Sequence, residues 1–88
     1  MKESVYREYT KFLDSLIYSI DHIDWRGERS LKMMMLLASL DEKHEPWPEE
    51  VLNYQKRVDE EIARFERGKI CEYDLMKKLT EIKREVKR

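Results

Sequence analysis

Four helix-interrupting residues divide the chain, and they constrain its fold more than any other feature. Gly27, Gly68, Pro46 and Pro48 are the only glycines and prolines in the sequence. Between them, apolar residues recur at steps of three and four, which is the spacing of one helix face and not the alternation of a strand. The sequence therefore predicts an all-α fold, a compact four-helix, mostly antiparallel bundle with a C-terminal helical hairpin.

The predicted helices follow these interruptions. They run from about Ser4 to Ile23, from about Glu28 to Glu42, from Pro48 to about Arg67, and from just after Ile70 to near the C-terminus. Ser4 suits an N-cap and Pro48 a first helical position. Gly27 and Gly68 suit left-handed C-terminal caps, and Cys71 with Asp74 has capping-box spacing. Because about three residues join the last two helices, these must fold back as a hairpin.

Each helix has an expected core face. Those of the first, third and fourth helices are Val5, Tyr9, Phe12, Leu13, Leu16, Ile20 and Ile23; Val51, Tyr54, Val58, Ile62 and Phe65; and Leu75, Leu79, Ile82 and Val86. The narrow apolar seams of the third and fourth helices favour coiled-coil-like packing.

Length and composition limit the class of protein. A chain of 88 residues is expected to form one domain, residues 1–88. Cys71 is the only cysteine, so no internal disulfide can form, and a single thiol is typical of a reducing compartment. We find no signal peptide and no stretch of about 20 apolar residues. We therefore expect a cytoplasmic protein that does not enter a membrane.

The content of charged and amide residues indicates the kind of organism from which the chain comes. Charged residues make up 42% of the chain, yet the net charge is only -1, which does not favour a protein that coats nucleic acid. Asn53 and Gln55 are the only amide side chains. Few amides combined with many Lys, Arg and Glu residues are typical of thermophiles, so we expect a thermophilic and archaeal source.

No group of residues predicts an active site, a metal or a cofactor. His22 and His44 lack a second His or Cys at ligand spacing, and three or four converging ligands are needed for a metal. Cys71 is read as a small buried apolar residue at a helix start. Asp59, Glu60 and Glu61 are read as a solvated face, with Arg57 pairing with Glu61 and Arg64 with Glu60. We expect no catalytic activity and no cofactor.

Basic residues suggest a nucleic-acid alternative. Trp25, Arg26, Arg29 and Lys32 cluster near the start of the second helix, and the last helix is rich in lysine and arginine. The residues of that helix proposed to contact phosphates are Lys78, Lys83, Arg84, Lys87 and Arg88. The competing interpretation is that these cations complement the helix dipole.

The segment from Leu31 to Leu40 is too apolar for one buried face. At 100° per residue, Met33, Leu36, Leu37 and Leu40 form one stripe, while the opposite stripe is Leu31, Met34, Met35 and Ala38. Either the helix is enclosed in the core of one chain, or its second stripe packs on a partner. We favour a homo-oligomer, most simply a dimer, with another protein as an alternative partner.

These observations lead to two functional hypotheses. The first is a small protein-interaction or oligomerisation module, or an accessory subunit without catalytic activity of its own. The second is a small nucleic-acid-binding regulator that uses the basic last helix. An apolar surplus in the second helix favours the first hypothesis, and a basic surplus in the last helix favours the second.

Overall fold

The computed structural model describes residues 2–40 and 47–87. Within these residues the chain forms four α-helices and no strand: α1 (Lys2–His22), α2 (Arg29–Leu40), α3 (Glu49–Glu66) and α4 (Glu72–Val86). The prediction of an all-α fold is confirmed. The predicted end of the second helix at Glu42 lies outside the described residues.

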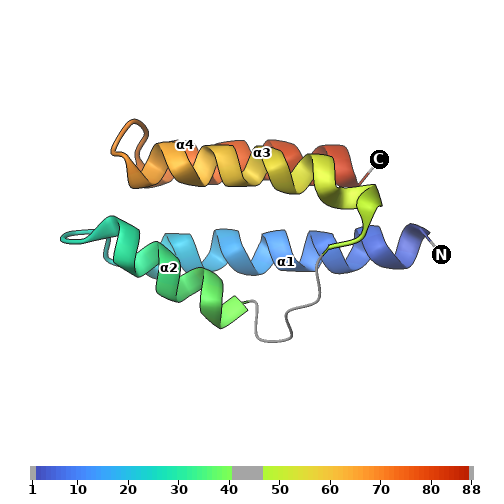
Figure 1. Cartoon of the computed structure of the whole chain (residues 1–88), viewed down its shortest axis with the longest axis horizontal. Coiled ribbons are helices and arrows are strands. Elements are labelled where there is room, and N and C mark those ends of the chain that lie inside the picture. Colours follow the sequence, from blue (N-terminus) through green and yellow to red (C-terminus); the bar gives the residue numbers. More distant parts are fainter. Residues whose placement is uncertain (1, 41–46, 88) are drawn as a thin grey trace.

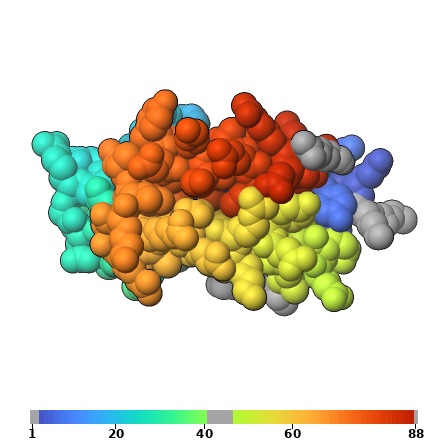
Figure 2. Space-filling model, turned by 90° about the horizontal axis from the view of Figure 1, so that it is seen from above, coloured from blue at the N-terminus to red at the C-terminus, as the bar shows by residue number. Residues whose placement is uncertain are grey.

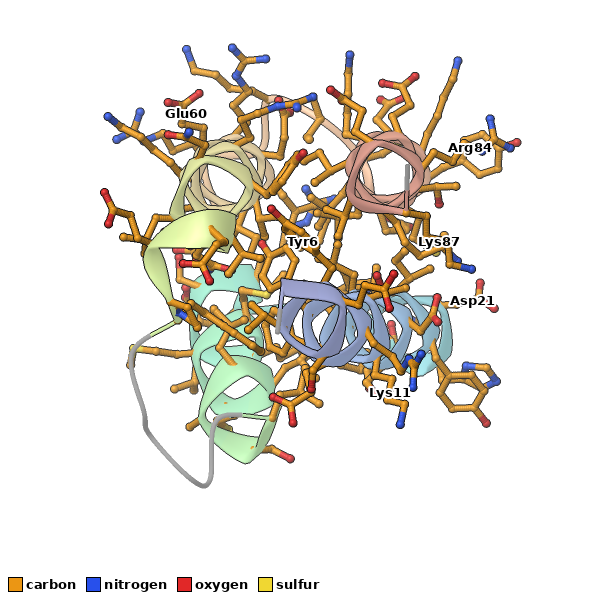
Figure 3. All side chains as sticks on the ribbon, turned by 90° about the vertical axis from the view of Figure 1, so that its right-hand side faces the viewer. Tyr6, Lys11, Asp21, Glu60, Arg84 and Lys87 are labelled. Atoms are coloured by element: carbon orange, nitrogen blue, oxygen red, sulfur yellow. The ribbon has the colours of Figure 1, made fainter. Side chains whose placement is uncertain are left out.

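The helices alternate in direction, as Figure 1 shows. Seen along the bundle, they occupy four corners (Figure 3), so α2 lies diagonally opposite α4. The most extensive contacts are those of α4 with α1 and α3, whereas α2 packs on α1 and α3 and, among the described residues, meets α4 at its first residue, where Arg29 lies 3.9 Å from Glu72. The result is a mostly antiparallel four-helix bundle in which α2 is the most peripheral helix.

The buried faces are those that the helical spacing predicts. The fully or nearly fully buried apolar residues of α1, α3 and α4 are Tyr9, Leu13, Leu16 and Ile20; Val51, Val58, Ile62 and Phe65; and Leu75, Leu79, Ile82 and Val86. Val5, Phe12, Ile23 and Tyr54 are partly buried against them. The expected seams therefore form the core.

The hairpin of α3 and α4 closes at Gly68, as expected. Gly68 has φ +76°, its N–H donates to the carbonyl of Phe65, and the N–H of Lys69 donates to that of Arg64. These two bonds are those of a Schellman motif, which satisfies carbonyls that the helix end would leave unpaired. The two helices then lie side by side along one face of the molecule (Figure 2).

Three predicted helix ends need correction. Ser4 is not an N-cap, because α1 already begins at Lys2, and Pro48 is the N-cap of α3 and not its first helical residue. Gly27 has φ +91°, but α1 ends five residues earlier, at His22. Gly27 therefore shapes the turn before α2 and does not cap α1.

The turn from α1 to α2 is held by side chains. Trp25 is buried, its Nε1 donates to the carbonyl of Ile20 at 2.9 Å, and its ring meets Phe65 edge-on at 4.8 Å. Arg26 donates hydrogen bonds to the Asp24 carboxylate, which lowers the pKa of Asp24. Trp25 thus belongs to the core and does not line a basic surface.

None of the helices in the described part of the chain is both long and apolar enough to cross a membrane.

Candidate interaction surface

The two predicted stripes of α2 lie in different environments. Met33 is fully buried and Leu36 nearly so, while Leu37 and Leu40 are partly buried against the core. On the opposite side, Leu31, Met34 and Met35 have 52%, 65% and 66% of their surface exposed, and Ala38 is also exposed. The helix is therefore not enclosed within one chain. We call Leu31, Met34, Met35 and Ala38 the α2 apolar face.

The exposed side of α2 carries no charge. All of Arg29–Leu40 is described, and the exposed residues other than those of the α2 apolar face are Ser30 and Ser39. At 100° per residue, these serines fall on its two opposite edges. In a chain with 42% charged residues, an uncharged helix side is unusual. Exposed apolar patches with polar rims are typical of contact sites in soluble proteins.

The basic residues of α2 are directed toward the rest of the bundle. The guanidinium of Arg29 donates to the carbonyls of Phe65 and Ile70, at 3.4 and 3.3 Å, and lies 4.7 Å from the centre of the Phe65 ring. The ammonium of Lys32 donates to the carbonyls of Asp24 and Arg26. These contacts anchor the start of α2 and keep both cations away from the α2 apolar face.

The basic residues of α4 are only partly free to meet a phosphate. Lys83 reaches across to α1, where its Nζ lies 2.6 Å from Oδ1 of Asp14. Lys78, Arg84 and Lys87 are exposed, and Figure 3 shows Arg84 and Lys87 pointing away from the bundle. Arg88 lies outside the described residues. The residues predicted to contact phosphates therefore do not form one continuous basic surface, because the charge of Lys83 is paired with that of Asp14.

Asp59 and Glu60 of the acidic run of α3 are exposed as predicted, but the Glu61 side chain is only 15% exposed, and the ion pairs differ from those predicted. Arg57 pairs with Glu85 of α4 at 2.7 Å, and this hydrogen bond raises the pKa of Arg57. Arg64 lies 3.7 Å from Glu61, one turn earlier in the same helix. The predicted pairs of Arg57 with Glu61 and Arg64 with Glu60 are wrong, because Arg57 finds a closer partner on the neighbouring helix.

Cys71 is exposed, so its interpretation as a buried apolar residue is wrong. It is the N-cap residue of α4, as the spacing indicated, but its side chain makes no capping bond to the backbone. Instead its Sγ donates to Oδ2 of Asp74 at 3.4 Å. The thiol is therefore available for chemical labelling without unfolding the protein.

The histidines give no metal site within the described residues. The ring of His22 stacks on Tyr18 with centroids 4.1 Å apart, and its Nδ1 lies 2.8 Å from the carbonyl oxygen of Tyr18. Because a carbonyl only accepts, Nδ1 is the donor. In the part of the chain that is described, no three His, Cys, Asp or Glu side chains converge. His44 lies outside it.

One open depression lies at the end of the bundle where the α1–α2 connection meets the α3–α4 connection. It encloses about 390 Å³ and is lined by Gly27, Glu28, Arg29, Ser30, Glu66, Arg67 and Gly68. Two acidic and two basic residues contribute to its lining, so it favours neither an anion nor a cation by net charge.

Comparison with protein-family models, with curated proteins and with solved structures gives no match. The functional argument therefore rests on the surface of this chain. The helical spacing identified the α2 apolar face correctly as a stripe. The positions of Ser30 and Ser39 at the two edges of this face were not predicted, although the same rotation of 100° per residue implies them.

Proposed function

We propose that this protein is a small interaction module that self-associates through the α2 apolar face. The observation that carries the proposal is the exposure of Leu31, Met34 and Met35 side by side on an uncharged helix surface. Burying a Leu or Met side chain fully is worth roughly 1.5–3 kcal/mol, so a partner that covers these residues gains free energy that an isolated chain does not.

The place of α2 in the bundle supports this role. As the most peripheral helix it packs on α1 and α3 and meets α4 through the ion pair of Arg29 with Glu72. Its anchoring contacts are at its start and on its buried side, through Arg29, Met33 and Leu36. A partner can therefore approach the exposed side without displacing the contacts that hold the helix.

The size of the α2 apolar face favours a weak, reversible contact. A standard interface involves about 20–30 residues a side, whereas the α2 apolar face has four. A small apolar centre with a polar rim is typical of interfaces in which few residues supply most of the affinity. A two-fold contact doubles the use of one such patch, because each copy buries the face of the other. We expect dissociation in the micromolar range.

The test is sedimentation equilibrium of the wild type and of the variant Met34→Lys with Met35→Glu. The wild type is expected to shift from one chain to two as its concentration rises through the micromolar range, and the variant to remain a monomer. Because both residues are exposed, the variant should keep its helical circular dichroism. The single variant Ala38→Lys should weaken association in the same way.

A matched control places the same charges elsewhere. Leu52→Lys with Tyr73→Glu also replaces two exposed apolar residues, of α3 and α4, and keeps the net charge unchanged. It should dimerise like the wild type. A wild type that stays monomeric throughout the micromolar range overturns the proposal, as does a control variant that loses association equally.

The nucleic-acid alternative receives less support, because Lys83 is paired with Asp14 and the net charge is -1. We expect only weak binding to random duplex DNA at physiological salt. Tight, salt-sensitive binding that is lost in Lys78→Glu with Arg84→Glu, and retained in Met34→Lys with Met35→Glu, would favour the regulator instead.

A further inference from the structure

We infer that Met34 and Met35 are sites of reversible oxidation by peroxides on the folded protein, and that this modification makes the α2 apolar face polar. The reaction needs only that the two side chains are accessible in the free chain, so it is independent of the proposed self-association. The basis is the placement of three methionines that are adjacent in the sequence but lie in different environments.

Exposure separates these methionines. Met34 and Met35 have 65% and 66% of their surface exposed, whereas Met33, the residue before them, is fully buried. Met76 of α4 is partly buried against the core. Because a peroxide must touch the sulfur in order to react, Met34 and Met35 react directly in the folded chain, while Met33 reacts only when α2 opens locally.

The reaction transfers one oxygen atom to sulfur. The thioether attacks the peroxide oxygen that carries a proton, the O–O bond breaks, and a sulfur–oxygen bond forms. The sulfur is oxidised by two electrons and the peroxide is reduced. The departing oxygen takes up the proton and leaves as water, or as an alcohol when the oxidant is an organic hydroperoxide. Methionine sulfoxide reductases reverse the modification, with a thiol as the reductant.

The product changes the surface of α2 without changing what holds the helix in place. A sulfoxide is polar, so two polar side chains would replace the two methionines that lie between Leu31 and Ala38 on the α2 apolar face. The core contacts of α2 are made from its other side, where Met33 is fully buried. Oxidation of Met34 and Met35 therefore alters the polarity of the face and leaves the fold intact, which oxidation of Met33 would not do.

Mass spectrometry after brief treatment with hydrogen peroxide tests the selectivity. The native thiol is first removed as Cys71→Ser, because an exposed cysteine also reacts with peroxides. Met33, Met34 and Met35 lie in one tryptic peptide, whose fragments report each residue separately. At protein concentrations below the micromolar range, we expect Met34 and Met35 to be oxidised at least about tenfold faster than Met33. In urea-unfolded protein the three should react at similar rates.

Hydrophobic-interaction chromatography tests the change of polarity. The oxidised protein is expected to elute earlier than the untreated protein and to keep its helical circular dichroism. Sulfoxide reductases with a thiol should restore its original retention. Met34→Leu with Met35→Leu, in the same Cys71→Ser background, is the matched control. It keeps the face apolar but removes both thioethers, so peroxide should leave its retention unchanged.

Three results would overturn the inference. The first is a folded protein in which Met33 is oxidised as fast as Met34 and Met35. The second is a leucine variant whose retention shifts with peroxide as much as that of its parent. The third is loss of the helical spectrum on oxidation, because the modification would then unfold the chain. Wild type that sediments only as a monomer contradicts the proposed function but leaves this inference standing.

Discussion

The phenol of Tyr9, in α1, donates a hydrogen bond of 2.9 Å to Oε1 of Gln55, in α3. Tyr9 is fully buried, and its ring meets Trp47 edge-on at 5.0 Å. The amide nitrogen of Gln55 in turn donates to Asp59 at 2.9 Å. The single glutamine of the sequence thus links a buried tyrosine to an exposed carboxylate, across the two diagonal helices of the bundle.

Tyr9→Phe is expected to lower the free energy of unfolding by about 1 kcal/mol, because it removes this bond and leaves the Gln55 oxygen without its donor. Urea denaturation followed by circular dichroism measures the change. Tyr73→Phe, at an exposed phenol, serves as the control and should change stability by less than about 0.5 kcal/mol. Equal losses in the two variants would contradict the role of the Tyr9 bond.

Stability should fall at alkaline pH, in part through Tyr9. Burial, with a smaller contribution from the charge of Asp59, raises the pKa of Tyr9 well above its usual value. Above about pH 10 the unfolded chain releases this proton and the folded chain keeps it, so stability decreases as pH rises. One such proton accounts for at most about 1.4 kcal/mol per pH unit. Tyr9→Phe should show a shallower decline above pH 10, and curves that stay parallel would contradict the prediction.

Adjacent methionines of α2 should respond differently to truncation. Met33→Ala is expected to cost about 2–5 kcal/mol of unfolding free energy, because Met33 is fully buried and its loss leaves a cavity. Met34→Ala, at an exposed position, should cost less than about 0.5 kcal/mol when measured in dilute monomer. Urea denaturation at low protein concentration gives both values. The reverse order would show that the two faces of α2 had been exchanged.

Gly68→Ala should destabilise the hairpin by about 1–2 kcal/mol, because an L side chain is strained at φ +76°. A Cβ at Gly68 would meet no atom within 4 Å, so the cost comes from the backbone and not from a clash. Gly68→Asn is the matched control, since asparagine tolerates this conformation better, and it should lose less. Thermal denaturation ranks the three proteins, and an asparagine variant weaker than the alanine variant would contradict the explanation.

Local spacing made most of the fold predictable. The stripes of α2 follow from the rotation per residue, so the separation of Met33 from Met34 needed no knowledge of other helices. The left-handed C-terminal cap at Gly68 was predictable in the same way, because it depends on residues adjacent in the chain. Whether the second stripe of α2 would be covered within one chain depends on how neighbouring helices are placed, and only the structure shows its exposure.

Predictions failed where the partner lay on another helix. The partner of Arg57 is Glu85, which is 28 residues away, so the nearer Glu61 was chosen wrongly. Lys83 was counted as a free cation because its partner Asp14 is 69 residues away. The contact of Tyr9 and Phe12 with Trp47 was missed for the same reason. Cys71 was assigned to the interior from its residue type, although a helix start next to a tight turn faces solvent.

The start of α1 and the end of α4 lie at the same end of the bundle, opposite both tight turns (Figure 1). α2 points toward that end from the turn that precedes it. A tag fused before α1 or after α4 is therefore placed at the end of the bundle away from Gly27 and Gly68, so it leaves the depression between those two turns open.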